Sequence, residues 1–213
     1  MAAAPQKDAP QLYLITPVGV HASELEPLLT LVMDRVTPAC LRIPGTGDEA
    51  ELGRIADLVR DIAHRRDIAV VIEDHVALAL RHGLDGVHLT DGARTVRYAR
   101  KELGADAIIG AYCATSRHDG MSAGEGGADY VAFGPVGDTA LGRGAAVELD
   151  LFEWWSEVIE VPVVAEGAIT ADIAGQLAPI TDFIAIGPEI WGQDDPASAL
   201  ADLWAAVTGA EAR

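Results

Sequence analysis

The chain has 213 residues, 50% hydrophobic and 23% charged, which is enough for one sizeable core but not for two. A formal net charge of −18 argues against nucleic acid and anionic membranes as partners, because the Lys and Arg density that neutralises phosphate is missing. The sequence has no apolar run of about eighteen residues, no signal-peptide pattern at its start, and only two cysteines. These features predict a cytoplasmic protein without a disulfide framework or a thiolate zinc site.

Short runs rich in Val, Ile and Ala alternate along the chain with stretches of helical periodicity. Each pair is predicted to be a strand followed by a helix. In chain order the pairs are Leu12–Thr16 with Glu24–Met33, Ala39–Ile43 with Glu49–Arg65, Ala69–Glu73 with Val76–His82, Gly86–Leu89 with Ala93–Leu103, Ala107–Gly110 with His118–Gly126, Tyr130–Phe133 with Leu151–Glu157, Pro162–Ala165 with Ala171–Leu177, and Phe183–Ile186 with Pro196–Val207.

This strict alternation predicts an α/β fold of parallel strands, and the apolar strands indicate a sheet buried on both faces. A single (β/α)8 TIM barrel is favoured over a doubly wound sheet, because no G-x-G-x-x-G follows the first strand. We expect a disordered tail over residues 1–10 and one barrel domain over residues 11–213. Trp154 and Trp155 should pack against the barrel or against a second subunit, so a homo-oligomer stays possible.

Candidate functional residues lie where the strands end, because barrels of this kind keep their sites at the C-terminal ends of the strands. Gly167 and Gly187 follow the last two strands, where barrels commonly bind phosphate through backbone N–H groups, although a tight turn explains either glycine equally well. The candidates are Arg42, Glu73, Asp74, His75, His88, Asp91, Tyr112, Cys113, Thr139, Arg143, Glu166, Gly167, Gly187 and Glu189.

Some of these residues also have a structural interpretation. Arg42 directly follows an apolar run, so its charge must meet either a ligand anion or an acid such as Glu73 or Asp74. His88 lies on a buried strand, which favours a hydrogen-bonded core histidine over a catalytic one. Cys113 is predicted to be a small buried residue, because nothing near it in sequence marks an activated thiol.

Several segments resemble the thiamine phosphate synthase and thiazole tautomerase family, in order and over almost the whole chain. They are Leu12–Thr16 (LYLIT), Val70–His75 (VVIEDH), Gly83–Leu89 (GLDGVHL), Ile108–Cys113 (IIGAYC), Gly127–Val136 (GADYVAFGPV) and Pro162–Ile169 (PVVAEGAI). The resemblance implies a TIM barrel that joins an aminopyrimidine diphosphate to a thiazole phosphate in thiamine biosynthesis. Pyrophosphate would be released and Mg²⁺ would be the cofactor, with small phosphorylated molecules as partners.

The resemblance also implies roles for individual positions. Asp74 matches a metal-binding aspartate, and Asp91 lies two residues before the second one, which aligns near Ala93. Together with the strand-end argument, this predicts Arg42, Asp74 and Thr139 as catalytic residues and Asp74 and Asp91 as metal ligands. The predicted substrate-binding residues are Glu73, His88, Tyr112, Cys113, Arg143, Glu166, Gly167, Gly187 and Glu189.

The sequence departs from the family pattern where the diphosphate should bind. Of the Gln-x-Arg-x-Lys motif after the second strand only Arg42 is kept, and the lysine of the sixth loop is absent. The serine after the eighth strand is replaced by Pro188, beside Glu189, whose charge would repel phosphate. The only lysines, Lys7 and Lys101, lie away from the strand ends. We therefore expect a degraded diphosphate-binding site.

Three functions are compatible with this pattern. The first is a thiamine phosphate synthase-like transferase with the degraded site. The second is a catalytically inactive or repurposed paralogue that binds a thiamine-pathway compound or another phosphorylated or cationic small molecule. The third is a thiazole tautomerase-like isomerase that uses Glu166 or His88 as its acid–base group. Burial of Glu166 would favour the third function, and full solvent exposure of Glu166 would oppose it.

Overall fold

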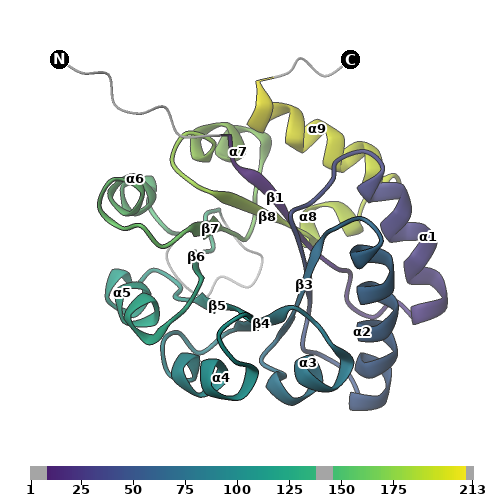
Figure 1. Ribbon diagram of the computed structural model, residues 1–213. Coiled ribbons are helices and arrows are strands. Elements are labelled where there is room, and N and C mark those ends of the chain that lie inside the picture. Colours follow the sequence, from purple (N-terminus) through teal and green to yellow (C-terminus); the bar gives the residue numbers. More distant parts are fainter. Residues whose placement is uncertain (1–8, 138–145, 210–213) are drawn as a thin grey trace.

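The computed structural model describes residues 9–137 and 146–209, and within them eight parallel strands form a closed barrel (Figure 1). Each strand pairs with the next one in sequence, and β8 pairs with β1 to complete the cylinder. The predicted TIM barrel is therefore confirmed, and the doubly wound sheet is excluded. The strands are β1 (Gln11–Ile15), β2 (Cys40–Ile43), β3 (Ala69–Glu73), β4 (Gly86–Leu89), β5 (Ile108–Tyr112), β6 (Tyr130–Phe133), β7 (Val163–Ala165) and β8 (Phe183–Ile186).

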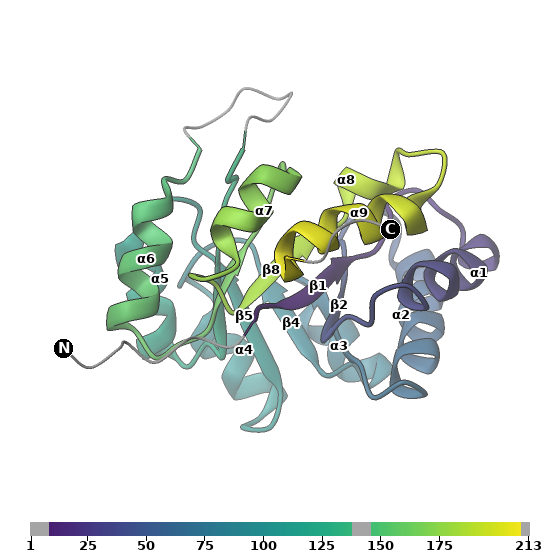
Figure 2. The same cartoon turned by 90° about the horizontal axis from the view of Figure 1, so that it is seen from above.

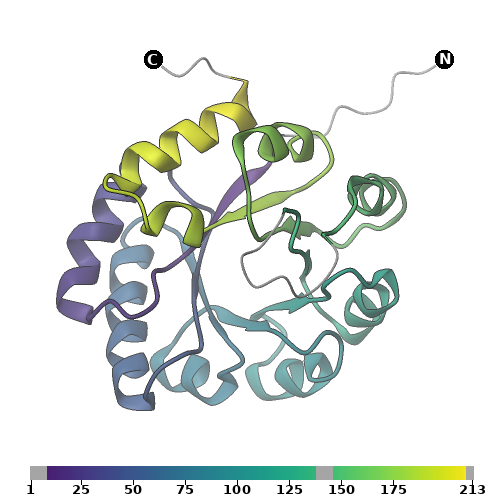
Figure 3. The same cartoon turned by 180° about the vertical axis from the view of Figure 1, so that it is seen from behind.

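Helices surround the strands as an outer layer, which Figures 1 and 3 show from opposite sides. None of the helices in the described part of the chain is long and apolar enough to cross a membrane. The tail expected over residues 1–10 lies outside the described residues, except for its last two positions. The helices are α1 (Ala22–Met33), α2 (Glu49–His64), α3 (Val76–His82), α4 (Val96–Leu103), α5 (Arg117–Gly126), α6 (Leu149–Val158), α7 (Ala171–Leu177), α8 (Pro188–Trp191) and α9 (Pro196–Thr208).

The short helix α8 is the element that the sequence patterns do not predict. It begins with Pro188 directly after Gly187, a position that suits proline because its missing N–H would have no helical partner there. Four residues are too few to show helical periodicity. Helix α8 packs against α9 (Figure 2). It also places Glu189 immediately beyond the end of β8.

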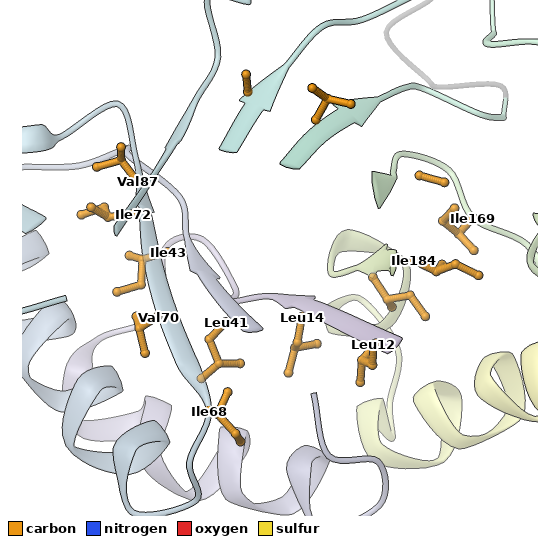
Figure 4. Packing of buried hydrophobic residues seen from close by; sticks show 14 of the residues in the cluster. Leu12, Leu14, Leu41, Ile43, Ile68, Val70, Ile72, Val87, Ile169 and Ile184 are labelled. Carbon is orange, nitrogen blue, oxygen red and sulfur yellow. The ribbon is translucent and has the colours of Figure 1, made fainter. Parts of the chain in front are cut away.

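The strand residues alternate between two separate hydrophobic clusters, as the two-residue period of a strand requires. Leu12 and Leu14 face outward into the large cluster beneath the helices, whereas Tyr13 belongs to the small cluster inside the barrel. Figure 4 shows the outward-facing side chains of β1, β2 and β3. Leu41 and Ile43 likewise face outward, so Arg42 between them must point into the barrel.

The barrel interior has room for its large residues because glycine stands opposite them. Gly110 on β5 pairs with Tyr130 on β6, and a Cβ atom added to Gly110 would lie 2.0 Å from Cζ of the tyrosine ring. Such a distance is far below van der Waals contact, so no side chain fits at position 110 while Tyr130 keeps its place. Glycine at this position therefore allows Tyr130 to occupy the interior.

We expect Gly110→Ala to lower the free energy of unfolding by about 1–3 kcal/mol, because the added methyl group overpacks the interior against Tyr130. Chemical denaturation of both proteins would measure the difference. Gly192→Ala is a suitable control, since nothing lies within 4 Å of a Cβ atom there and φ is −86°. Equal stability of Gly110→Ala and the unaltered protein would contradict the interpretation.

Candidate active site

Arg42 is held inside the barrel by acids from two other strands. Its side chain is almost fully buried, yet Nη1 donates to Oε2 of Glu166 at 2.6 Å. Nε lies 3.1 Å from Oε1 of Glu73, although the angle does not make a hydrogen bond and Nε–H has no hydrogen-bond partner among the described residues. The ion-pair alternative for Arg42 is thus observed with Glu73 but not with Asp74, and Glu166 is a partner that sequence reasoning did not foresee.

The two carboxylates determine the charge state of this cluster. Burial alone would lower the pKa of Arg42, but the neighbouring anions, led by Glu166, outweigh it and raise that pKa above its usual value. Arg42 therefore stays positively charged at every pH at which the fold survives. By formal charge, one guanidinium and two carboxylates give this cluster one net negative charge.

His88 adjoins this cluster inside the barrel and contacts Arg42, and it is buried rather than exposed at the mouth of the barrel. Its side chain is 1% exposed, and Nε2 lies 2.9 Å from Nη1 of Arg42. Since a guanidinium can only donate, Nε2 must accept, and the ring proton resides on Nδ1. Nδ1 then donates to the hydroxyl of Tyr130 at 2.9 Å. Burial, together with the charge of Arg42, lowers the pKa of His88 well below its usual value, so the ring is neutral.

The hydrogen-bonded column continues from His88 into the lower part of the barrel. The hydroxyl groups of Tyr130 and Tyr13 lie 2.7 Å apart, and the ring of Tyr13 is 5.6 Å from Cζ of Arg42. Sequence reasoning did not single out these tyrosines. The alternation of the strands could have indicated them, because Tyr13 and Tyr130 occupy positions that point into the barrel, as Arg42 and His88 do.

The predicted metal ligands lie at the ends of the neighbouring strands β3 and β4. Asp74 has a left-handed φ of 56°, and its N–H donates to the carbonyl of His88. Its carboxylate accepts from the N–H of Thr90 at 2.8 Å and from the hydroxyl of the same residue. Asp91 follows Thr90 directly and accepts a hydrogen bond from Thr95. Thr90 therefore ties the first aspartate to the loop that carries the second.

A cavity of about 480 Å³ opens between the loops that follow β4 and β5. Its volume lies within the range of small-molecule sites. Arg94 lines this cavity and was not among the predicted site residues, although it lies only three positions after Asp91. The lining residues are Thr90, Asp91, Gly92, Ala93, Arg94, Tyr112, Cys113, Ala114, Asp119 and Ser122.

Tyr112 and Cys113 face this cavity as neutral groups. The Tyr112 hydroxyl donates to the carbonyl of Gly134 at 2.7 Å, and burial, followed by the nearby Glu166, raises the pKa of Tyr112 to about 12. Burial, followed by the charge of Asp119, raises the pKa of Cys113 to about 12 as well. A thiol with so high a pKa is not an activated nucleophile.

The ends of β7 and β8 are joined by a carboxylate. Gly167 and Ala168 both have positive φ values, 87° and 57°, which turns the chain sharply after β7. Beyond this turn, the N–H of Ile169 donates to Oε1 of Glu189 at 3.2 Å. The N–H of Gly187 donates to the other oxygen, Oε2, at 2.9 Å.

The predicted site residues therefore fall into three groups at one end of the barrel. Arg42, Glu73, Glu166 and the buried His88 form the central ion cluster, Asp74, Asp91, Tyr112 and Cys113 surround or adjoin the cavity, and Gly167, Gly187 and Glu189 lie at the ends of β7 and β8. Thr139 and Arg143 lie outside the described residues, so their predicted roles stay predictions. Within the described residues, no group of three or more His, Cys, Asp or Glu side chains forms a ready-made metal site.

Comparisons with known proteins identify the relatives of this chain. The family model described as thiamine monophosphate synthase matches residues 12–189. A thiamine-phosphate synthase from Erythrobacter litoralis is 41% identical over 195 residues, covering 88% of this chain and 91% of the relative. One from Rhodospirillum centenum is 40% identical over 198 residues, covering 91% and 95%. The solved structure of a thiamine phosphate pyrophosphorylase from Pyrococcus furiosus is 26% identical and superimposes with a TM-score of 0.77, covering 95% of this chain and 97% of the other.

The buried neutral His88 predicts a pH dependence of stability. Below about pH 6.5 the unfolded chain protonates this imidazole, whereas the native state does not until a much lower pH. In this range the unfolded state binds more protons than the native state. His88 therefore makes the free energy of unfolding decrease as the pH is lowered, by up to about 1.4 kcal/mol per pH unit. We expect the stability of His88→Gln, measured by urea denaturation, to fall less steeply between about pH 6.5 and pH 5 than that of the unaltered protein. Parallel curves would contradict this.

Proposed function

This chain belongs to the thiamine monophosphate synthase family, and from that membership and the geometry of its barrel mouth we propose that it joins an aminopyrimidine diphosphate to a thiazole phosphate, releasing pyrophosphate. The observation that carries the proposal is the placement of Asp74 and Asp91 after adjacent strands. Asp91 lines a cavity large enough for a small ligand, and Asp74 is hydrogen-bonded to Thr90, which lines the same cavity. The buried thiols Cys40 and Cys113 suit a reducing compartment, and we place the reaction in the cytoplasm.

The residues after β3 and β4 fit a magnesium ion. Mg²⁺ is usually held by one or two carboxylates together with substrate phosphates and water, and does not need a complete set of protein ligands. Asp74 and Asp91 provide that donor set, and the hydrogen bonds from Thr90 orient the first of them. The bound ion would supply positive charge against the diphosphate as it leaves.

Arg94 provides a cation in a chain that lacks the family's strand-end lysines, although it lies in a different loop, after β4. Its side chain lines the same cavity as Asp91 and is exposed, so it is free to reach an anionic ligand there. A planar guanidinium also binds phosphate oxygens in pairs, which a lysine ammonium does not. We therefore assign the diphosphate to the cavity between the loops after β4 and β5, with Arg94 as one of its contacts. Thr139 and Arg143 stay further candidates by resemblance.

The ion cluster around Arg42 suits the other half of the reaction. Departure of the diphosphate leaves positive charge on the pyrimidine, and preorganised negative charge stabilises a developing cation. With Arg42 fixed between Glu73 and Glu166, the cluster offers one net negative charge in a poorly hydrated place. Arg42 is in this view a positioning residue, which holds the two carboxylates at a fixed separation.

The isomerase alternative has less support from this geometry. The carboxylate of Glu166 is engaged by Arg42 at 2.6 Å, and its side chain is 15% exposed, which is neither full burial nor full exposure. His88 is neutral and enclosed, with both ring nitrogens hydrogen-bonded inside the barrel. His88 is therefore not free to exchange a proton with a ligand at the mouth, and one carboxylate oxygen of Glu166 is already bonded to Arg42.

The direct test is to incubate the purified chain with both precursors and Mg²⁺ and to measure the condensed product and pyrophosphate. We expect both to form in equal amounts. If no product forms at high protein concentration, the transferase proposal is wrong. Thermal stabilisation by the precursors without product would then indicate the non-catalytic paralogue.

We expect Asp74→Asn to lower kcat/KM at least about 100-fold, because the amide removes a negative charge and an oxygen ligand from the proposed Mg²⁺ site. The Mg²⁺ concentration for half-maximal rate should rise as well, which a merely structural defect would not cause. Asp106→Asn makes the same chemical change at an exposed residue just before β5, at the opposite end of the barrel. An Asp74→Asn enzyme with an unchanged Mg²⁺ requirement would exclude Asp74 as a ligand.

A further inference from the structure

The carboxylate of Glu189 occupies the place where a barrel of this kind commonly binds phosphate. Such phosphate sites are formed by the loops after the seventh and eighth strands, whose backbone N–H groups point at the anion. Here the N–H groups of Ile169 and Gly187 come from those two loops. Both donate to the same carboxylate, one to each oxygen, at 3.2 and 2.9 Å. The chain thus supplies an anion of its own at this position.

The surrounding backbone keeps this arrangement in place. Gly187 is buried against β1, and a Cβ atom added to it would lie 2.7 Å from Cβ of Ile15, so the loop passes too close to β1 for a side chain. Pro188 follows it and has no N–H to offer an anion. Glu189 itself is only partly exposed and bridges Ile169 and Gly187, which are 18 positions apart in sequence. Its carboxylate satisfies two backbone donors that would otherwise need another acceptor.

A phosphate group and this carboxylate cannot use the same two N–H groups together. Each N–H has one hydrogen to donate, and both groups are anions, so their close approach is repulsive. A ligand phosphate must therefore displace the carboxylate before it gains these hydrogen bonds. A substrate with a neutral hydroxyl in place of the phosphate faces no such conflict, because a hydroxyl can donate a hydrogen bond to the carboxylate.

We propose that Glu189 is a specificity-determining residue that competes with the phosphate of the thiazole substrate for the N–H groups of Ile169 and Gly187. The proposal rests on the proposed transferase function. It concerns whether the thiazole substrate carries a phosphate group. Glu189 weakens binding of the phosphorylated thiazole and leaves binding of the same thiazole with a free hydroxyl unaffected or strengthened. The preference of the chain for the phosphorylated thiazole over the unphosphorylated one is therefore smaller than it would be without this carboxylate.

The test compares Glu189→Ala and Glu189→Gln with the unaltered protein and with Asp194→Asn. The control removes one negative charge from an exposed residue five positions further along the chain. Calorimetric titration with inorganic phosphate, without other substrates, measures the anion site directly. We expect Glu189→Ala to bind phosphate at least tenfold more tightly than the unaltered protein. Asp194→Asn should bind it as the unaltered protein does.

Steady-state kinetics provide the second measurement. In Glu189→Ala the KM for thiazole phosphate should fall at least tenfold, while the KM for the unphosphorylated thiazole should stay the same or rise. Glu189→Gln removes the charge but keeps the side-chain volume and one acceptor oxygen, so both KM values should change in the same direction as in Glu189→Ala. This variant provides the test if Glu189→Ala does not fold. Unchanged phosphate affinity and an unchanged ratio of the two KM values in a folded variant would overturn the proposal.

The two proposals fail in different ways. If the unaltered protein forms product and the Glu189 variants do not change phosphate binding, the inference about Glu189 is wrong and the transferase function stands. If no protein forms product but the variants bind inorganic phosphate more tightly, the transferase function is wrong and Glu189 still controls the phosphate position.

Discussion

The guanidinium of Arg42 lies inside the barrel, between Glu73 and Glu166 and in contact with His88, and the end of the barrel that carries the site is organised around it. Removing a charge from water is costly unless partners compensate for the lost hydration, and removing one partner leaves the others uncompensated. Because its partners lie on β3 and β4 and directly after β7, the cluster also fixes the relative positions of those strand ends. Tyr130 extends this network below His88, so the geometry of the site depends on packing deep in the barrel.

The distribution of charge explains how a chain with so few lysines can retain diphosphate chemistry. The only cation that lines the cavity between the loops after β4 and β5, among the described residues, is Arg94. The nearby aspartates are suited to bring in Mg²⁺, which carries more positive charge than any side chain. The proposed site thus separates its charges, with cations near the leaving diphosphate and the net negative Arg42 cluster near the pyrimidine. Such a separation stabilises both ions that form when the bond breaks.

Glu189 shows how a single side chain changes a site without changing the fold. The N–H groups of Ile169 and Gly187 must be hydrogen-bonded in the absence of a ligand, and a carboxylate on α8 meets that requirement. In the role proposed for Glu189, the same contact satisfies both N–H groups in the free protein and leaves the phosphate position less available. The barrel is unaffected, because the strands beneath are held by their own ladder and by the apolar layer under the helices.

The sequence alone determined the barrel and the end of it that bears the site. Apolar runs of strand and helix periodicity specify the elements locally. Because side chains alternate along a strand, Arg42 points into the barrel while Leu41 and Ile43 point outward, and the chain order places the acids at the strand ends. Only the tertiary structure decided which of these charges meet. Arg42 and Glu166 are 124 positions apart, and only closure of the barrel brings them together. The contact between Glu189 and Ile169 likewise depends on the short helix α8 and on backbone N–H directions, for which side-chain patterns carry no signal.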